Sequence, residues 1–258
     1  MKGLILAGGR GTRLSPMTNY INKHLLHVYN KPMFYYPLSI LLLLDIREIG
    51  IVCNPGDEEL FSQALKGCSK SLSVEYFHQE NASGIPDAIL SAEEFVGEED
   101  CFICLGDNVI FGMDLITTIR EAISENIGQK LVGFSYPVVD PNRFGVVERL
   151  NGEIKEIIEK PLFTNSNEAL IGAYYFPQYS INSLRKLEPS KRGETEIVDV
   201  FNIFNLDNRL HVAKLGRGHF WMDVGTPAAL HDASSFVQIM QKRQGMEIAN
   251  LDEILREK

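Results

Sequence analysis

A glycine-rich segment near the N-terminus contains residues that could bind a phosphate chain. It runs Leu6-Ala-Gly-Gly-Arg-Gly-Thr-Arg-Leu14, directly after a short apolar stretch. Glycine reaches positive φ and lets backbone N–H groups approach phosphate oxygens, and Arg13 could add a positive charge. A tight strand-to-helix turn without a ligand would use the same residues. The segment fits neither the dinucleotide fingerprint, whose third glycine would fall at Leu14, nor the Walker loop, which ends in Gly-Lys-Ser/Thr.

Two acidic side chains elsewhere could serve phosphate chemistry. Asp107 follows the apolar run 101–105 and is expected at the solvent-facing end of a strand, although a turn or a helix cap would also use aspartate. Because Mg²⁺ binds one or two carboxylates together with phosphate oxygens and water, Asp107 and the distant Asp223 suit this ion.

The cysteines and histidines do not suggest a zinc site. A C-x-x-C motif joins Cys101 and Cys104, but no second pair accompanies it, and the six histidines are scattered. Apolar residues surround the motif. This favours buried structural thiols over a redox pair, and the same is expected for Cys53 and Cys68.

The hydrophobic pattern predicts the elements that would position these residues. Short apolar runs predict strands at 4–6, 49–53, 74–77, 101–105, 131–136, 144–150, 153–158, 171–176 and 210–215. Between them, helices are predicted at 33–47, 87–95, 181–187, 197–206 and 228–243. Pro32, Pro86 and Pro227 are expected at N1 of three of these helices, with Thr226 as an N-cap, and Asn151-Gly152 is a hairpin signal.

Alternation of strands and helices predicts an α/β fold. Its sheet should be mostly parallel and flanked by helices on both faces, with a small lobe formed beyond about residue 140. In such sheets, ligands bind at the carboxyl ends of the strands. The glycine segment and Asp107 both follow predicted strands, so the candidate phosphate site is expected at that edge.

Length and charge exclude several classes of protein. The chain has 258 residues, 45% of them hydrophobic and 23% charged, as in an ordinary globular domain. Lys plus Arg is 25 and Asp plus Glu is 34, so the net charge of −9 argues against general binding to nucleic acid or to an anionic membrane. The start lacks the apolar region of a signal peptide, and the run Leu38–Leu44 is too short to span a bilayer. A cytoplasmic protein is expected.

Several motifs follow one another in the order found in a known family. They are Gly8–Leu14, Asn22–Leu26, Lys31–Met33, Leu105–Asn108, Asp140–Val147, Glu159–Pro161, Arg192–Ile197 and Trp221–Thr226. Over about residues 1–245, the chain resembles the sugar-phosphate nucleotidyltransferases, and most closely the glucose-1-phosphate thymidylyltransferases. The resemblance implies the nucleotide-diphospho-sugar transferase fold, a Rossmann-like sheet with a small sugar-binding lobe. It also implies a nucleotide-binding half at about 1–137, a sugar-binding half at about 138–226 and a short tail at 246–258.

The resemblance implies a reaction as well. Glucose 1-phosphate would attack the α-phosphorus of dTTP with the help of Mg²⁺, giving dTDP-glucose and pyrophosphate. Arg13 would hold the triphosphate near the leaving pyrophosphate, Lys23 would approach the α-phosphate, and Asp107 and Asp223 would bind Mg²⁺. The implied nucleotide-binding residues are Leu6, Ala7, Gly8, Gly9, Gly11, Thr12, Arg13, Gln79, Gly84 and Asp107. The Gln79 amide fits the edge that thymine and uracil share, although a strand-end amide in solvent is the alternative.

For the sugar phosphate, the resemblance implies contacts from the second half of the chain. The residues are Gly145, Glu159, Lys160, Ile171, Arg192 and Trp221. Lys160 would hold the phosphate, and Glu159 would accept hydrogen bonds from ring hydroxyls. Apart from these implied roles, Lys23 could be an exposed lysine of a loop and Lys160 a solvated lysine at a strand end. Arg192 could add a charge to the phosphate or form a salt bridge with a neighbouring glutamate. Trp221 could be an anchor of the core or a wall of the sugar pocket.

Four positions depart from the family pattern. Pro86 and Asp87 replace a small residue and an amide beside the base, His27 replaces a proline, and Phe144 replaces a tyrosine. These departures leave dTTP against UTP, and the identity of the hexose 1-phosphate, as open alternatives.

Three other functions are alternatives to this one. A catalytically silent subunit that only binds a nucleotide sugar would be free to lose Arg13, Lys23, Asp107, Lys160 and Asp223, yet all five are present. An NAD-dependent oxidoreductase would need the third glycine, and a glycosyltransferase would need an Asp-x-Asp pair. Apart from its substrates, the chain is expected to bind copies of itself. It resembles the short form of the family, without the C-terminal regulatory segment, so no second nucleotide site is expected.

Overall fold

The residues of this chain fall into two compact units. The computed structural model describes residues 1–68, 71–79 and 83–256. One unit consists of residues 2–80, 104–111 and 220–258, and we call it the loop unit because it holds the glycine segment. The other consists of residues 81–103 and 112–219 together with Met1, and we call it the hairpin unit. The chain crosses between the units repeatedly, so residues far apart in sequence meet within each.

The sheet of the loop unit is parallel, and its strands end level with one another. The strands are Lys2–Ala7 (β1), Glu48–Cys53 (β4) and Ser73–His78 (β5). β1 pairs with β4, and β4 with β5, in a register that aligns Ala7, Cys53 and His78. The glycine segment, residues 54–57 and Gln79 therefore all leave the sheet from one edge.

The helices of the loop unit are Tyr35–Leu43 (α1), Glu58–Ala64 (α2), Pro227–Gln244 (α8) and Leu251–Arg256 (α9). The predicted start of α8 is confirmed, because the Thr226 hydroxyl accepts a hydrogen bond from the Ala229 N–H at 3.2 Å. The predicted helix 33–47 is too long. Pro32 lies in a short strand, and Asp45, at φ 67°, turns the chain away before Ile46. Because α1 is apolar on nearly every side, no change of periodicity marked its ends.

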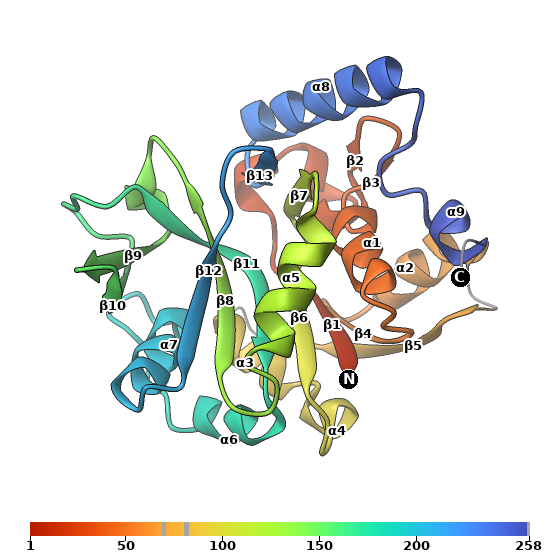
Figure 1. The fold of residues 1–258 in the computed structure, drawn as a ribbon. Coiled ribbons are helices and arrows are strands. Elements are labelled where there is room, and N and C mark those ends of the chain that lie inside the picture. The colour runs from red at the N-terminus through yellow and green to blue at the C-terminus, as the bar shows by residue number, and fades with distance from the viewer. Residues whose placement is uncertain (69–70, 80–82, 257–258) are drawn as a thin grey trace. The chain divides into compact units, whose positions relative to one another are not determined.

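Short strands absent from the sequence prediction complete the loop unit. They are His27–Val28 (β2), Lys31–Pro32 (β3), Asn108–Gly112 (β7) and His219–Asp223 (β13), of which β7 and β13 pair. α8 packs along β2 (Figure 1). It covers an apolar cluster that includes Val28, Val109, Val224 and Val237, all fully buried. The cluster fixes the beginning of β7 and the end of β13, and Asp107 and Asp223 lie at those two points.

The hairpin unit contains strands of both directions. They are Leu131–Pro137 (β8), Gly145–Leu150 (β9), Glu153–Glu159 (β10), Glu168–Phe176 (β11) and Leu210–Lys214 (β12). β12 is parallel to β8, whereas β11 runs antiparallel to β8 and to β9. β9 and β10 form the predicted hairpin, with Asn151 at φ 53° and Gly152 at φ 89° in its turn. This pair of positive angles is what an Asn-Gly turn provides.

The helices of the hairpin unit are short. They are Ile85–Leu90 (α3), Glu93–Val96 (α4), Leu115–Ser124 (α5), Ile181–Leu184 (α6) and Ile197–Leu206 (α7). The prediction of one helix at 87–95 is wrong, because the chain leaves helical hydrogen bonding at Ser91 and Ala92 and divides it into α3 and α4. Pro86 does lie in the first turn of α3. Single turns of 3-10 helix occur at 12–14, 17–19, 23–25, 141–143 and 178–180.

These elements confirm the predicted α/β class, with a mixed, mostly parallel sheet flanked by helices. β6 (Cys101–Leu105) has residues in both units and leads into Asp107. All four cysteines are buried and free, as predicted.

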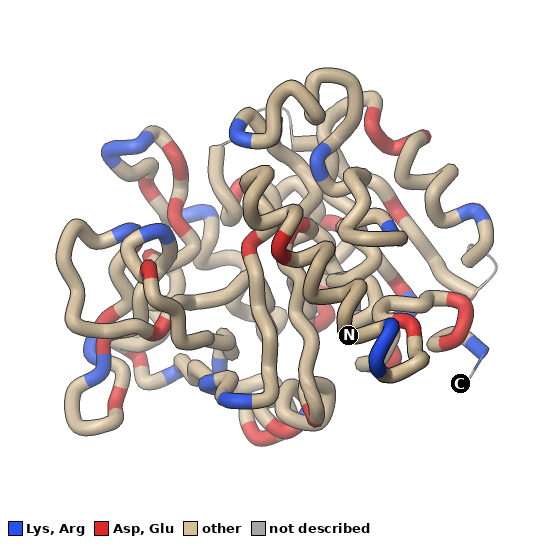
Figure 2. Tube along the Cα trace, turned by 90° about the horizontal axis from the view of Figure 1, so that it is seen from above, with Lys and Arg blue, Asp and Glu red and all other residues tan. Residues whose placement is uncertain are grey.

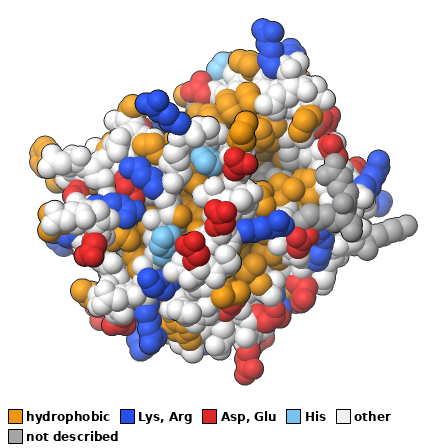
Figure 3. All heavy atoms as spheres, viewed as in Figure 1, with side chains coloured by type: hydrophobic (Ala, Val, Ile, Leu, Met, Phe, Trp, Pro, Cys, Tyr) orange, Lys and Arg blue, Asp and Glu red, His pale blue; other side chains and the backbone are white. Residues whose placement is uncertain are grey.

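Charges of both signs are interspersed along the chain. Figure 2 shows Lys and Arg close to Asp and Glu in many places, and the face in Figure 3 carries both signs beside hydrophobic side chains. Within the described residues, no helix combines the length and the apolar character that a membrane crossing requires.

Candidate active site

The glycine segment is an ordered turn at the carboxyl edge of the loop unit's sheet. Gly9 has φ 95°, and its N–H donates to Asn54 Oδ1 at 3.1 Å. Gly11 has φ 57° and begins the 3-10 turn Thr12–Leu14. Its carbonyl accepts a hydrogen bond from the Thr18 hydroxyl at 2.9 Å. Both angles lie in the left-handed region that glycine adopts without strain, as the sequence predicts.

Two glycines also allow predicted site residues to approach the loop. A Cβ on Gly11 would lie 3.0 Å from the Cβ of Lys23, and a Cβ on Gly8 would lie 3.1 Å from Oε1 of Gln79. The structure therefore brings Lys23 and Gln79 against the glycine segment from opposite ends of it. Leu6 and Ala7 are buried, and their carbonyl groups bind Gly106 N–H and the Asn22 amide within the protein.

Lys23 and Asp107 form the shortest ion pair of the candidate site. The distance from Lys23 Nζ to Asp107 Oδ2 is 2.5 Å, with 16% and 13% of the two side chains exposed. Asp107 follows β6, as predicted, but it is buried rather than solvent-facing. Burial alone would raise the pKa of Asp107, but the Lys23 charge and the hydrogen bonds from Lys23 and Asn108 outweigh it and hold the pKa below its usual range. The carboxylate is therefore ionised in the folded protein.

The second oxygen of Asp107 is held as well. The Asn108 amide donates to Asp107 Oδ1 at 3.0 Å, and Trp221 Nε1 donates to Asn108 Oδ1 at 2.6 Å. Trp221 is only 7% exposed. Its indole therefore orients the amide that orients Asp107.

Lys23 begins the 3-10 turn Lys23–Leu25, which we call the Lys23 turn. Asn22 and His24 flank Lys23 and support this turn, and neither was among the predicted site residues. The Asn22 amide donates to Ala7 O at 2.9 Å and to Asp57 Oδ2 at 2.8 Å, so its oxygen must be the atom that accepts from His24. This assigns the proton of a neutral His24 ring to Nδ1, 2.8 Å from Asn22 Oδ1. Burial, with the Lys23 charge beside it, lowers the pKa of His24 to about 3. The polar run Asn22-Lys-His24 was the available signal, but only the fold shows that its flanking residues are buried.

Asp223 lies next to the same cluster. It ends β13, and the N–H of the following Val224 donates to the carbonyl of Asp107 at 2.9 Å. Arg13 Nη2 lies 4.0 Å from Asp223 Oδ2, and 60% of the Arg13 side chain is exposed. Gly225 makes room for this arginine, since a Cβ there would lie 2.6 Å from Nη2. Asp107 and Asp223 offer only carboxylate oxygens, the donor type that Mg²⁺ prefers.

In the hairpin unit, three predicted residues meet at the end of β10. Glu159 Oε1 lies 3.2 Å from both Lys160 Nζ and Arg192 Nη1. Arg192 also contacts Glu194 at 3.1 Å and Glu196 at 3.4 Å, so the predicted alternative of a salt bridge with a neighbouring glutamate is confirmed. Lys160 has φ 43°, an uncommon backbone angle for a lysine. Its N–H binds the Phe144 carbonyl at 2.9 Å, which ties the turn to the residue before β9.

The remaining predicted residues of the hairpin unit occupy several places. A Cβ on Gly145 would lie 2.8 Å from Val198 and 3.4 Å from Glu159 Oε2, so this glycine lies against the charged group. Ile171 is buried within β11. Gly84 has φ 115°, and a Cβ there would lie 2.1 Å from the carbonyl oxygen of Thr195. The backbone of Gly84 thus lies directly against the 190–196 loop that carries Arg192.

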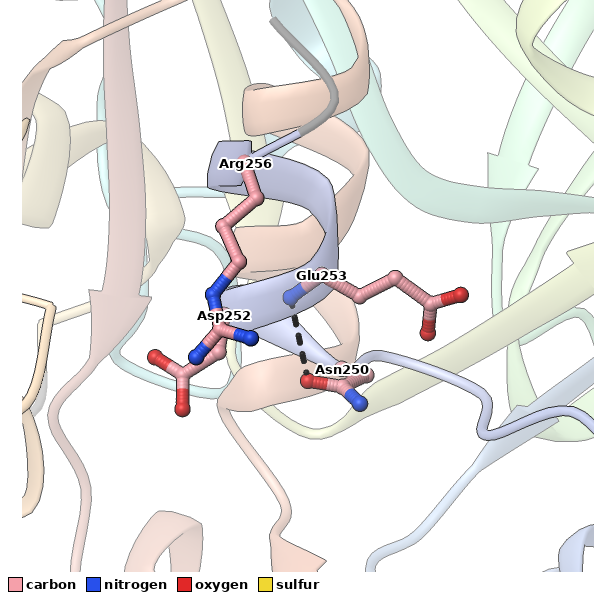
Figure 4. Close-up of a pocket in the computed structure, with 4 residues that line it drawn as sticks. All are labelled: Asn250, Asp252, Glu253 and Arg256. Atoms are coloured by element: carbon pink, nitrogen blue, oxygen red, sulfur yellow. Dashed lines mark hydrogen bonds between the residues drawn. The ribbon is translucent and has the colours of Figure 1, made fainter.

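The two cavities described for the structure contain none of the predicted site residues. One, of about 390 Å³, is lined by residues 250, 252, 253 and 256 at α9, where Glu253 N–H donates to Asn250 (Figure 4). The other, of about 400 Å³, is lined by Asn142, Glu148 and residues 162–165. The candidate site is therefore defined by its hydrogen-bonded clusters.

Comparison with known proteins places the chain in a family. A family model described as nucleotidyl transferase matches residues 2–239. The chain belongs to this nucleotidyl transferase family. Over 256 residues it is 42% identical to a glucose-1-phosphate thymidylyltransferase of Neisseria meningitidis, a match that covers 98% of this chain and 88% of that protein.

Solved structures agree with this assignment. A Bacillus anthracis protein crystallised in complex with sucrose matches with a TM-score of 0.83 at 34% identity, covering 92% of this chain and 94% of that one. A UDP-glucose pyrophosphorylase complexed with UDP-glucose matches with a TM-score of 0.82 at 24% identity, covering 93% and 98%, and shows the fold alone. The predicted nucleotide-diphospho-sugar transferase fold is confirmed. As a nucleotidyl transferase, the chain is an enzyme, and the oxidoreductase and glycosyltransferase alternatives no longer apply.

Proposed function

We propose that this nucleotidyl transferase forms dTDP-glucose and pyrophosphate from dTTP and glucose 1-phosphate. The observation that carries the proposal is the buried Lys23–Asp107 pair beside the glycine segment, in a chain whose curated relative of 42% identity bears the name of this activity. Such a pair combines a cation for a phosphate with a carboxylate for a metal ion, the two charges that transfer between polyanions requires.

The reaction needs little acid–base catalysis. The second pKa of a phosphate monoester is about 6, so the attacking oxygen of glucose 1-phosphate is largely ionised at neutral pH. This oxygen forms a bond to the α-phosphorus of dTTP as the bond to the pyrophosphate breaks. The obstacle is repulsion between two anions, so catalysis depends on position and on neutralising charge.

In the loop unit, the proposed work is nucleotide binding and stabilisation of the transferred group. Backbone N–H groups of the glycine segment approach the triphosphate, and Arg13 holds the end that leaves. From its fixed place beside Asp107, Lys23 stabilises the negative charge that develops at the α-phosphate. The Gln79 amide, which lies against Gly8, reads the pyrimidine edge. Asp107 and Asp223 fit a Mg²⁺ ion, which would supply further neutralisation of the phosphate oxygens when bound.

In the hairpin unit, the proposed work is to bind the sugar phosphate. Lys160 and Arg192 supply positive charge, and Glu159 accepts hydrogen bonds from sugar hydroxyls. Gly145 leaves room beside Glu159, because a side chain at that position would meet its carboxylate. The phosphate must compete with the glutamates that now surround Arg192, so exchange of ion pairs is part of binding.

A second candidate changes only the substrates, to UTP or to another hexose 1-phosphate. It is favoured by Pro86 and Asp87 in the first turn of α3, where the resembling enzymes carry a small residue and an amide. The methyl group that distinguishes thymine from uracil is worth only ~1 kcal/mol of burial.

A pyrophosphate-release screen of nucleoside triphosphates against sugar 1-phosphates tests the proposal. We expect dTTP with glucose 1-phosphate to give the highest rate, with measurable use of UTP and poor use of CTP and purine triphosphates. Mass spectrometry should identify dTDP-glucose. A Lys23→Ala preparation made in parallel controls for contaminating enzymes. Preference for CTP or ATP, or product at the same rate with the Lys23→Ala preparation, would refute the assignment.

A further inference from the structure

A group of the loop unit outside the proposed machinery combines a thiol, an imidazole and a carboxylate. Cys53 ends β4, His78 ends β5 and Glu58 begins α2. One donor atom from each residue lies within 4.8 Å of the other two. Among residues 1–68, 71–79 and 83–256, it is the single cluster of three or more potential metal ligands with this spacing.

The parallel register explains why these side chains meet. Cys53 and His78 are register partners on neighbouring strands, so both side chains project from the same face of the sheet. Glu58 reaches them from the start of α2, and its Oε2 lies 3.3 Å from His78 Nε2. Cys53 is fully buried, whereas about 40% of the Glu58 and His78 side chains is exposed. The group thus has a buried sulfur and an open side through which an ion could enter.

The donor set matches one class of metal ion. Zn²⁺ binds sulfur, imidazole nitrogen and carboxylate oxygen, and a water can occupy its fourth tetrahedral position. Mg²⁺ prefers oxygen donors alone, which separates this group from Asp107 and Asp223. We propose that Cys53, Glu58 and His78 bind a Zn²⁺ ion.

Ion binding must change the state of the thiol. Burial, with the carboxylates of Asp57 and Glu58 beside it, raises the pKa of Cys53 to about 12, so the metal-free protein carries a neutral thiol. A sulfur–zinc bond forms as the S–H bond breaks, and the proton leaves to solvent. The thiolate charge is then balanced by the ion, with no electron transfer.

The position of the group indicates a structural effect on the glycine segment. Each ligand is a chain neighbour of a residue already described: Asn54 follows Cys53, Asp57 precedes Glu58, and Gln79 follows His78. Asn54 binds Gly9, and Asp57 binds the amides of Asn54 and Asn22 at 2.8 Å. An ion that joins the ends of β4 and β5 to α2 would therefore order residues 54–57, which support the glycine segment.

Cobalt spectroscopy tests the site without any assay of activity. Protein freed of zinc with a zinc-selective chelator is titrated with Co²⁺, which occupies zinc sites and absorbs light. We expect one equivalent to produce a thiolate-to-metal band and tetrahedral d–d bands, both removed by added Zn²⁺. Zn²⁺ should also raise the melting temperature. Absence of the thiolate band would overturn the proposal, because Asp107 and Asp223 offer no sulfur.

Matched variants assign the ligands. Cys53→Ser and His78→Gln should abolish the thiolate and tetrahedral bands respectively, and Glu58→Gln should weaken Co²⁺ binding at least tenfold. Cys68→Ser, at another buried thiol of the same unit, should leave the spectrum unchanged. Retention of the thiolate band in Cys53→Ser would refute the site.

A separate control tests whether the variants still fold. Melting temperatures without metal should be similar in the wild type and in His78→Gln, whose side chain is partly exposed. If Cys53→Ser fails to fold, His78→Gln decides the question through the loss of tetrahedral coordination. The proposal does not rest on the substrate assignment, since every readout is of metal binding.

Discussion

The two charged clusters of this enzyme differ in burial although both are proposed to handle phosphate. In the loop unit, Lys23 and Asp107 are joined at 2.5 Å, with about 15% of each side chain exposed. In the hairpin unit, Glu159 is shared by Lys160 and Arg192 at 3.2 Å, and more than 40% of both basic side chains is exposed. The first cluster is a fixed pair in a low dielectric, and the second is an exchangeable group screened by water.

This difference indicates how each cluster works. Asp107 is held on both oxygens and Lys23 lies against Gly11, so the loop unit fixes charges before the substrate arrives. Groups fixed in this way act strongly on a transition state. Exposed cations exchange partners at little cost, which suits recognition of a phosphate that must enter and leave. We therefore expect kcat effects from the loop unit and KM effects from the hairpin unit.

The largest effect is expected from Lys23→Ala. The contact with the α-phosphate strengthens as charge develops, so kcat should fall by a hundred- to a thousandfold, equivalent to ~2.7–4 kcal/mol, with a smaller change in the KM for dTTP. Steady-state kinetics with both substrates varied measures the two constants separately. Lys160→Ala should instead raise the KM for glucose 1-phosphate. A near-normal kcat in Lys23→Ala would contradict the role assigned to the buried pair.

Asp107→Asn tests the carboxylate of the same pair. The amide keeps the shape but lacks the charge, so the Mg²⁺ concentration for half-maximal activity should rise as turnover falls. Asp223→Asn should do the same. Rates measured over a range of Mg²⁺ concentrations give this value, and an unchanged requirement in both variants would rule out the metal role.

For the loop unit, the sequence suggested which residues could bind phosphate or a metal ion, but it did not indicate how these residues are packed. The glycine segment and Asp107 were proposed from their residue types and their places after predicted strands, and Lys23 was proposed from the resemblance to the family. The burial of Asp107 could not be predicted, since it depends on β7 and β13 and on Asn22 and His24. Strands of two residues, such as β2 and β3, are too short to show a periodic pattern of apolar residues in the sequence.

Gly106→Ala should destabilise the loop unit by ~1–3 kcal/mol, the usual cost of overpacking. A Cβ at this position would lie 2.7 Å from Cδ2 of the His24 ring and 3.0 Å from the carbonyl oxygen of Leu6. Neither group can move without disturbing β1 or the Lys23 turn. Urea unfolding gives the change, and Gly67→Ala, whose added Cβ would meet nothing within 4 Å, is the matched control. Equal stability of the two variants would contradict the packing argument.

In the hairpin unit, the sequence predicted the strands well, but it did not settle which charged residues contact one another. Its strands and its Asn151-Gly152 turn were predicted closely, because short apolar runs and an Asn-Gly turn are local signals. The partners of Arg192 were left as alternatives, because Glu194 and Glu196 are near in sequence while Glu159 becomes a neighbour only in the fold. Local patterns predict elements, and long-range contacts decide which charges meet.

His24→Gln should reduce the loss of stability in mild acid. The folded-state pKa of about 3 lies below the ordinary value of 6.5, so the unfolded chain binds the extra proton and stability falls as pH drops below 6.5. Between pH 7.5 and 5.5 this costs about 1.4 kcal/mol for a buried neutral ring. Urea unfolding of both proteins at the two pH values should show a smaller loss, by about this amount, in His24→Gln. The same loss in both would mean that the ring is accessible to protons when folded.

The smallest effect is expected from Glu194→Gln, which tests directly whether the ion pairs of the hairpin unit exchange. Arg192 is divided among three glutamates, and Glu194, with 40% of its side chain exposed, contacts it at 3.1 Å. Removing this charge frees the guanidinium for the sugar phosphate. Because exposed pairs are worth ~0.2–1 kcal/mol, the KM for glucose 1-phosphate should fall by about 1.5- to 5-fold, with kcat unchanged. The gain should shrink as salt is added, since screening weakens the competing pair. Kinetics at low and high ionic strength provide the measurement, with Lys160→Ala as the variant of opposite sign. A higher KM in Glu194→Gln would mean that this glutamate positions Arg192 rather than competing for it, and the hairpin unit would then be preorganised like the loop unit.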